Sequence, residues 1–103
     1  MPVKSFSIAL STRGNADIHD ITDQVSHRVA ESELKDGTVT IFCPSSTSAL
    51  TTIEYESGVL GDLRRLFDEI IPPNREYAHN ARWGNGHSHV RASLLGPSLR
   101  FHL

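Results

Sequence analysis

Histidine is concentrated in one short stretch, residues 84–93, which has the sequence GNGHSHVRAS. His87, His89 and Arg91 occupy every second position within it. In a β-strand, residues two apart point to the same face and lie roughly 6–7 Å from each other. The spacing therefore predicts a strand that gathers His87, His89, Arg91 and Ser93 on one face, with a mainly apolar face directed to the core.

Such a face favours binding of a phosphate-like oxyanion. Imidazolium donors and the guanidinium fork of Arg91 match oxyanion geometry, and Gly84 and Gly86 leave room for close approach. The same pair of strand histidines, with His79 as a third ligand, suits zinc, which is the alternative. Arg91 disfavours a bare cation by charge repulsion, so the oxyanion is the preferred interpretation. A solvated strand face without a ligand is the third possibility.

Hydroxyl and carboxylate groups earlier in the chain are further candidates. Ser46 and Thr47 belong to a hydroxyl-rich turn after Pro44, and such hydroxyls can hydrogen-bond a phosphate. Glu54 can act as a general acid or base, or can orient a histidine. Glu56 is better explained as a solvated carboxylate.

Composition narrows the class of protein. With 103 residues, 38% hydrophobic and 21% charged, the chain has room for one folded domain with a modest core. The net charge of −2 and the lack of a lysine or arginine run argue against nucleic acid and membrane surfaces as partners. A single cysteine, Cys43, excludes an intrachain disulfide, and the N-terminus lacks the pattern of a signal peptide. We therefore expect a cytoplasmic protein.

Two amphipathic helices are predicted. Ile21, Val25 and Val29 recur at four-residue spacing, which favours a helix over residues 22–34, capped by Asp20 or Thr22 and stopped by Gly37. A second apolar stripe predicts a helix over residues 58–70. Ser57 is its expected cap, and Pro72 and Pro73 end it.

Strands are expected on both sides of these helices. Residues 3–10 alternate like a half-buried strand, and residues 38–44 (TVTIFCP) have the composition of a buried central strand. Residues 48–55 can continue as strand, and residues 74–86 form a polar loop. Because strict βαβ alternation is missing, the pattern predicts an α+β fold with a mixed, mainly antiparallel sheet packed with two helices.

Four stretches together resemble the YjbQ family, the secondary thiamine-phosphate synthase type proteins. They are ITDQV, GTVTIFCPSSTSALTTIEYESGVLGDL, EYAHN and GNGHSHVRASLLGPS, and they extend the resemblance from about Phe6 to Ser98. The resemblance implies a small α+β fold and a homotrimer with histidine-rich sites at subunit boundaries. It also implies a secondary transferase activity in thiamine biosynthesis, which joins a pyrimidine pyrophosphate to a thiazole phosphate and releases pyrophosphate.

The resemblance extends to individual polar positions. Those that match the family pattern are Glu54, Asp62, His79, Asn85, His87, His89 and Arg91. Two departures stand out: Ser45-Ser46 replaces a histidine followed by threonine found in many relatives, and the Gly-Thr-Trp-Gln segment that follows the Gly-Pro-Ser turn in the family is absent. The expectation is one YjbQ-like domain over residues 1–103, shortened at its C-terminus.

These observations assign expected roles. The catalytic residues are expected to be His79, His87, His89, Arg91 and Glu54, and the substrate-binding residues Ser46, Thr47, Asn85 and Arg91. Arg91 and protonated His87 or His89 would stabilise the charge on departing pyrophosphate, and Mg²⁺ would be held by substrate phosphates and Glu54. Zn²⁺ on His79, His87 and His89 is the alternative metal. The expected partners are a small phosphorylated substrate and two further copies of the chain. The competing function is a non-catalytic trimeric module that binds phosphate or zinc.

Overall fold

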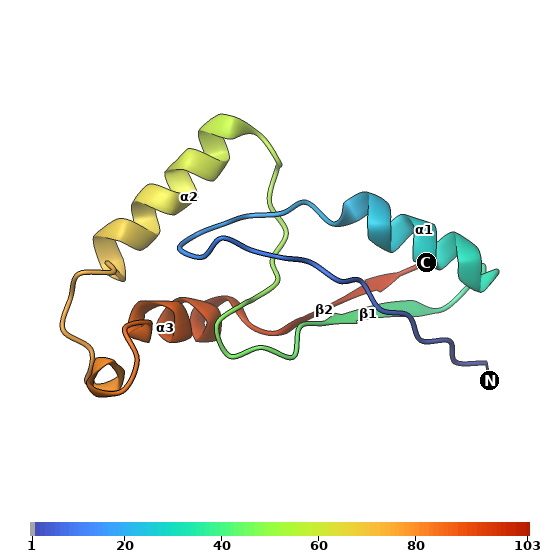
Figure 1. Cartoon of the computed structure of the whole chain (residues 1–103). Coiled ribbons are helices and arrows are strands. Elements are labelled where there is room, and N and C mark those ends of the chain that lie inside the picture. Colours follow the sequence, from blue (N-terminus) through green and yellow to red (C-terminus); the bar gives the residue numbers. More distant parts are fainter. Residues whose placement is uncertain (1) are drawn as a thin grey trace. The chain divides into compact units, whose positions relative to one another are not determined.

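A computed structural model describes residues 2–103 and confirms the α+β class. In chain order the elements are α1 (Thr22–Ser32), β1 (Thr38–Phe42), α2 (Ser57–Ile70), the 3-10 helix η1 (Ala78–Ala81), α3 (Gly86–Leu95) and β2 (Ser98–His102) (Figure 1). The chain divides into two compact units, one holding the residues up to Val39 with Phe101–Leu103 and the other Thr40–Arg100. Among residues 2–103, no helix has the length and apolar character needed to cross a membrane.

Helix α1 forms close to where its apolar spacing predicts it. Asp20 precedes it and accepts a hydrogen bond from the backbone N–H of Thr22 at 3.0 Å, which supplies a partner for one of the free N–H groups of the first turn. The helix ends earlier than expected. Glu33 adopts a left-handed conformation (φ 62°) and donates its N–H to the Ala30 carbonyl, so Glu33, rather than Gly37, stops the helix.

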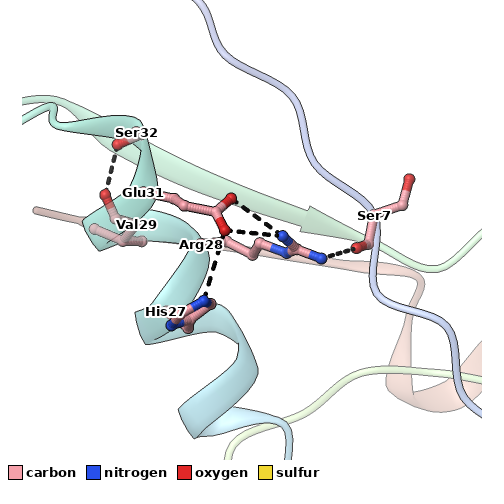
Figure 2. Close-up of polar contacts among 6 residues, drawn as sticks. All are labelled: Ser7, His27, Arg28, Val29, Glu31 and Ser32. Atoms are coloured by element: carbon pink, nitrogen blue, oxygen red, sulfur yellow. Dashed lines mark hydrogen bonds and ion pairs between the residues drawn. The ribbon is translucent and has the colours of Figure 1, made fainter.

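The N-terminal segment is extended but joins no strand, so the strand expected over residues 3–10 is wrong. Its contacts run through a side chain of α1 instead. Figure 2 shows Arg28 donating to the Ser7 carbonyl at 3.3 Å and to the Glu31 carboxylate at 3.1 Å. The Arg28 guanidinium also lies 5.8 Å from the centre of the Phe6 ring, a cation–π distance. These contacts hold the segment without backbone pairing.

Strands β1 and β2 form a two-stranded sheet. Beyond the strand ends, Cys43 donates its N–H to the Pro97 carbonyl and Leu103 donates to the Gly37 carbonyl, a pairing that is antiparallel. A strand forms within residues 38–44, as expected, but the prediction that this strand is central and buried is wrong. Since β1 has a single neighbour in the described chain, its burial alternates, and Phe42 keeps 64% of its surface exposed.

Helix α2 begins one residue before the predicted start. Glu56, and not Ser57, caps it: the Glu56 carboxylate accepts from the N–H groups of Gly58 (2.7 Å) and Val59 (3.0 Å). The helix ends at Ile70, just ahead of the two prolines, as expected. The segment between β1 and α2 contains no regular structure, so the strand continuation over residues 48–55 is wrong.

The most buried apolar side chains lie in the second unit. They are Leu60, Phe67, Ile71 and Ala92, from α2, the residue that follows it, and α3. The stripe predicted for α2 (Val59, Leu63, Leu66, Phe67 and Ile70) is confirmed only in part: Phe67 is buried, but Leu66 and Ile70 are 47% and 44% exposed, and Leu60 is buried instead. Ala92 of α3 supplies the side of this core that was expected to come from a strand.

Candidate functional site

The histidine-rich stretch is a helix, so the predicted strand is wrong. Helix α3 covers Gly86–Leu95 and begins where the Asn85 carbonyl accepts from the N–H groups of Ser88 and His89. Alternating apolar residues suggested a strand, but Val90 and Leu94 also fit one face of a helix at four-residue spacing. With 3.6 residues per turn, positions two apart point about 200° from each other. His87 and His89 therefore lie on opposite sides, whereas His87 and Arg91 share a face.

Arg91 is engaged in holding α3 against the end of α2. Its side chain is buried, with 7% of the residue surface exposed. Nε donates to the Ile71 carbonyl at 3.0 Å, Nη2 lies 3.2 Å from the Asp68 carboxylate, and the guanidinium sits 5.3 Å from the centre of the Phe67 ring. The guanidinium thus has a carboxylate and a carbonyl as partners, which makes it an anchor of the fold as well as a source of positive charge.

His79 lies next to His89. The ring centres are 4.3 Å apart and the ring planes are tilted by 59°. His79 belongs to η1, whose last turn is closed by hydrogen bonds from Arg82 and Trp83 to the His79 carbonyl. The structure therefore joins His79 to the neighbourhood of His89, on the side of α3 away from Arg91.

Gly86 allows η1 and α3 to approach closely. Its N–H donates to the Asn80 side-chain oxygen at 2.9 Å. A Cβ added at Gly86 would lie 2.5 Å from the Tyr77 Cβ, closer than packed carbons come, whereas one at Gly84 would meet nothing within 4 Å. The lack of a side chain at Gly86 thus allows η1 and α3 to pack closely. Asn80 and Tyr77, which hold this junction, were not predicted. Both residues belong to the EYAHN motif, which could have indicated them, although only its histidine was a candidate.

Three buried polar atoms at the junction of η1 and α3 have no hydrogen-bond partner among residues 2–103. They are His79 Nε2, Asn85 Oδ1 and His87 Nδ1. Buried polar atoms in proteins are nearly always paired, and an exception is often explained by a function. His87 is 9% exposed, and its other ring nitrogen lies 3.5 Å from the Ser88 hydroxyl. This group of atoms, together with His89, is named the η1–α3 site below.

His87 is held in the neutral form at neutral pH. Burial lowers its pKa below the usual 6.5, and the positive charge of Arg91 lowers it further. The expectation that a protonated His87 supplies positive charge is therefore corrected for neutral pH. A neutral imidazole offers one donor and one acceptor, and which nitrogen carries the proton depends on its partners.

The other predicted residues lie outside these contacts. Glu54 is exposed, and its carboxylate makes no hydrogen bond or ion pair with residues 2–103. Thr47 donates its N–H to the Ser45 hydroxyl in an exposed turn that also contains Ser46. Asp62 is exposed on α2 and pairs with Arg65. No interaction links these side chains to the η1–α3 site in the part of the chain described.

Residues 2–103 contain no group of three or more His, Cys, Asp or Glu side chains that could hold a metal ion. The separation of His87 from His89 around α3 accounts for this, since zinc requires its ligands to converge tetrahedrally. His79, His87 and His89 of a single chain therefore do not fit a three-histidine zinc site.

Comparison with known proteins identifies the family. Residues 6–103 match the family described as UPF0047 protein YjbQ-like, and the chain belongs to this family. It is 36% identical over 92 residues to a UPF0047 protein of Archaeoglobus fulgidus, covering 89% of this chain and 71% of the relative. A UPF0047 protein of Methanothermobacter thermautotrophicus is 36% identical over 98 residues, which cover 95% and 68%.

Solved structures share the fold. A YbjQ-like protein of unknown function from Sulfolobus solfataricus superimposes with a TM-score of 0.87 at 35% identity, covering 91% of this chain and 68% of that protein. An uncharacterised conserved protein of the YjbQ/UPF0047 family from Clostridium acetobutylicum gives a TM-score of 0.79 at 33% identity, with 90% and 72% covered. The resemblance seen in the sequence motifs is thereby confirmed, together with the α+β fold.

Proposed function

We propose that the protein is a transferase of the secondary thiamine-phosphate synthase type, acting on small phosphorylated substrates at the η1–α3 site. The reaction joins a pyrimidine pyrophosphate to a thiazole phosphate and releases pyrophosphate. The observation that carries the proposal is the set of three unpartnered buried atoms on adjoining elements. Leaving such atoms unpaired costs about 1–3 kcal/mol each, and a bound substrate would offset that cost.

The proposed roles follow from the contacts. His87 binds substrate through a neutral ring, whereas His79 and His89 lie side by side on the opposite face of α3. Arg91 acts mainly as a positioning residue, because its Nε and Nη2 already have protein partners. Its positive charge, four residues from His87 on the same helix face, still favours negative charge that develops on a departing pyrophosphate.

A divalent cation bound to the phosphate groups of the substrate would suit this reaction. Mg²⁺ binds oxygen ligands and is commonly held by substrate phosphates with one or two carboxylates. Glu54 is exposed, and its carboxylate has no partner among residues 2–103, so it can contribute one oxygen. Ser46 and Thr47, exposed in the hydroxyl-rich turn, are the proposed further contacts to phosphate.

We also propose that the working protein is a homotrimer. Val90 and Leu94 lie on one face of α3 and are 44% and 62% exposed, which leaves apolar surface beside the η1–α3 site. A second copy could cover that surface and complete the site. Light scattering of the purified protein at micromolar concentration tests this, and a monomer alone would contradict it.

The function is tested by complementation and by direct assay. Expression in a host that lacks thiamine-phosphate synthase should relieve its thiamine requirement, and the purified protein should form thiamine phosphate. His87→Ala should abolish both, while His27→Ala should not, because His27 is largely exposed on α1. If the wild-type protein is folded and abundant yet inactive in both assays, the proposal is wrong.

The non-catalytic module is the second candidate, and the buried positions of His87 and Arg91 favour it. Under that function, His87→Ala would dissociate the assembly. Loss of activity with the assembly intact supports the enzyme instead.

A further inference from the structure

We infer that residues 3–10 of one copy of the chain add as a parallel β-strand to the free edge of β1 in a second copy. The inference rests on the homotrimer of the proposed function, and it goes further by naming the strands that join the copies. It involves no part of the η1–α3 site. The two segments match in their free backbone groups, in their side-chain faces and in their charge.

Residues 3–10 have an extended backbone with one open edge. None of their N–H or C=O groups bonds to another backbone group among residues 2–103. Only the Ser7 carbonyl is engaged, by the Arg28 side chain (Figure 2). Successive residues of an extended chain direct their backbone groups to opposite sides. The groups of Phe6, Ile8 and Leu10 therefore point away from Arg28 and are free to pair.

Strand β1 also has one open edge, and its register with β2 shows which residues lie on it. The hydrogen bonds at the two ends of the sheet involve Gly37 and Cys43, both odd-numbered. In an antiparallel pair, the residues that bond to the partner strand alternate with residues that do not. Thr38, Thr40 and Phe42 therefore direct their N–H and C=O groups away from β2.

The side-chain faces match when the two strands run parallel. In that orientation Ile8 lies opposite Val39 and Leu10 lies opposite Ile41, because each bonds to the two residues that flank the opposite one. Val39 and Ile41 are the half-buried side chains of β1, so the incoming segment extends the apolar face of the sheet. Antiparallel pairing would place Ile8 and Leu10 beside the exposed threonines instead.

Charge favours β1 over β2 as the acceptor. By the same alternation, Arg100 lies on the free edge of β2, and charged side chains on an edge discourage the addition of a strand. Arg100 would also repel Lys4 of the incoming segment. Strand β1, with the sequence TVTIF, carries no charge and consists of residues with high β propensity.

A second copy supplies both halves of this contact. In the described chain, residues 3–10 do not pair with β1, and Phe6 and Leu10 remain 43% and 49% exposed. The donor segment and the acceptor edge are different surfaces, so the contact between copies is head-to-tail. Head-to-tail contacts form a ring when their rotation closes, and a ring of three is the proposed homotrimer.

Hydrogen exchange of the wild-type protein, followed by NMR, tests the two edges directly. In the assembled protein, the amides of Ile8 and Thr40 should exchange at least about tenfold more slowly than the amide of Ala9, which lies on the other edge of its segment. Dilution that dissociates the assembly should remove the difference. Equal exchange of the three amides in the assembled protein would overturn the inference.

Proline variants separate the donor from the acceptor. Ile8→Pro removes an N–H from the open edge of the segment, and Thr40→Pro removes one from the open edge of β1. Light scattering should show each variant alone as a monomer and their mixture as a dimer, because Thr40→Pro still donates a strand and Ile8→Pro still accepts one. Ala9→Pro is the matched control and should assemble like the wild type.

Three results would contradict the exchange of strands between copies. They are wild-type assembly of either Ile8→Pro or Thr40→Pro, a mixture of the two that stays monomeric, and loss of assembly in a folded Ala9→Pro. Circular dichroism establishes that each variant is folded. If one is not, the hydrogen exchange of the wild-type protein still decides.

The inference and the proposed function can fail separately. A trimer in which the Ile8 and Thr40 amides exchange freely would refute the inference and leave the trimer standing. A protected edge in a protein that forms no thiamine phosphate would do the reverse for the transferase. A wild-type protein that is monomeric at every concentration would refute both the inference and the trimer, and would leave the free edges to a strand of another protein.

Discussion

Arg91 donates from Nε to the backbone carbonyl of Ile71 over 3.0 Å, so a buried guanidinium of α3 caps the C-terminal end of α2. The carbonyl groups of a last helical turn have no partner within the helix. The bond explains how α3 is fixed against α2. It gives Arg91 a structural role, whereas its sequence position near two histidines had suggested a role in binding.

Replacing this arginine should destabilise the protein. Arg91→Met removes the donors to Ile71 and Asp68 and leaves a buried carbonyl unpaired, so the free energy of unfolding should fall by about 2–3 kcal/mol. Asp68→Asn should cost less, since Asp68 is 60% exposed. Urea denaturation, followed by circular dichroism, measures both free energies of unfolding, and Arg75→Met, at an exposed position, is the control. If Arg91→Met were as stable as the wild type, the stabilising role of Arg91 would be refuted.

A methyl group at Gly86 should separate η1 from α3. Gly86→Ala places a Cβ 2.5 Å from the Tyr77 Cβ, which is bonded to the backbone and cannot swing away, and 2.9 Å from the Asn80 side-chain oxygen. We expect a loss of about 2 kcal/mol in the free energy of unfolding. Gly84→Ala is the matched control, because nothing lies within 4 Å of its added Cβ. Similar denaturation midpoints for the two variants would show that η1 and α3 are not in close contact at Gly86.

The cap of α2 should be sensitive to acid. Hydrogen bonds from the N–H groups of Gly58 and Val59 hold the pKa of Glu56 below its usual 4.5. Since the folded state favours the carboxylate, this stabilisation is present above about pH 4.5 and is lost as the pH falls through the lower folded pKa. Glu56→Gln should therefore lower Tm by about 5 °C at neutral pH and by little in strong acid. Glu54→Gln serves as the control. If the Tm difference between Glu56→Gln and wild type did not depend on pH, the ionised Glu56 carboxylate would not be what stabilises the start of α2.

The His87 ring should titrate below its usual range. Burial, and then the charge of Arg91, lower its pKa from 6.5. The unfolded chain then binds the proton more readily, so stability is fully present above about pH 6.5 and declines as the pH falls from there toward the folded pKa. NMR titration of the ring should show the midpoint below 6.5. A midpoint at or above 6.5 would mean that the neutral ring required by the η1–α3 site is not favoured.

The helices of the fold could be predicted from sequence where the apolar period was unambiguous. The stripe in α2 and the spacing of Ile21, Val25 and Val29 in α1 both placed helices within two residues at either end. The strands were predicted less well, because their pairing depends on distant partners. Residues 38–44 contain β1, as expected, but residues 3–10 alternate correctly and yet pair with no strand in the described chain.

The site was predictable in its residue types but not in its geometry. The alternation of His87, His89 and Arg91 suggested that all three share one strand face. In the helix the two histidines lie on opposite faces, and His87 shares its face with Arg91. The spacing of Val90 and Leu94 fits both the strand period of two and the helix period of 3.6. A stretch of about ten residues was therefore too short to distinguish a strand from a helix. The partners of Arg91, Asp68 on α2 and Ile71 just after it, are 23 and 20 positions away, and no local pattern indicates them.

The rate of thiamine phosphate formation by the purified protein tests the central claim most directly. The assay supplies the pyrimidine pyrophosphate, the thiazole phosphate and Mg²⁺, and follows the product by chromatography. We predict product with the wild-type protein and with His27→Ala, and at least a hundredfold less with His87→Ala of unchanged fold. No product with a folded wild-type protein, or equal rates with and without His87, would contradict the account.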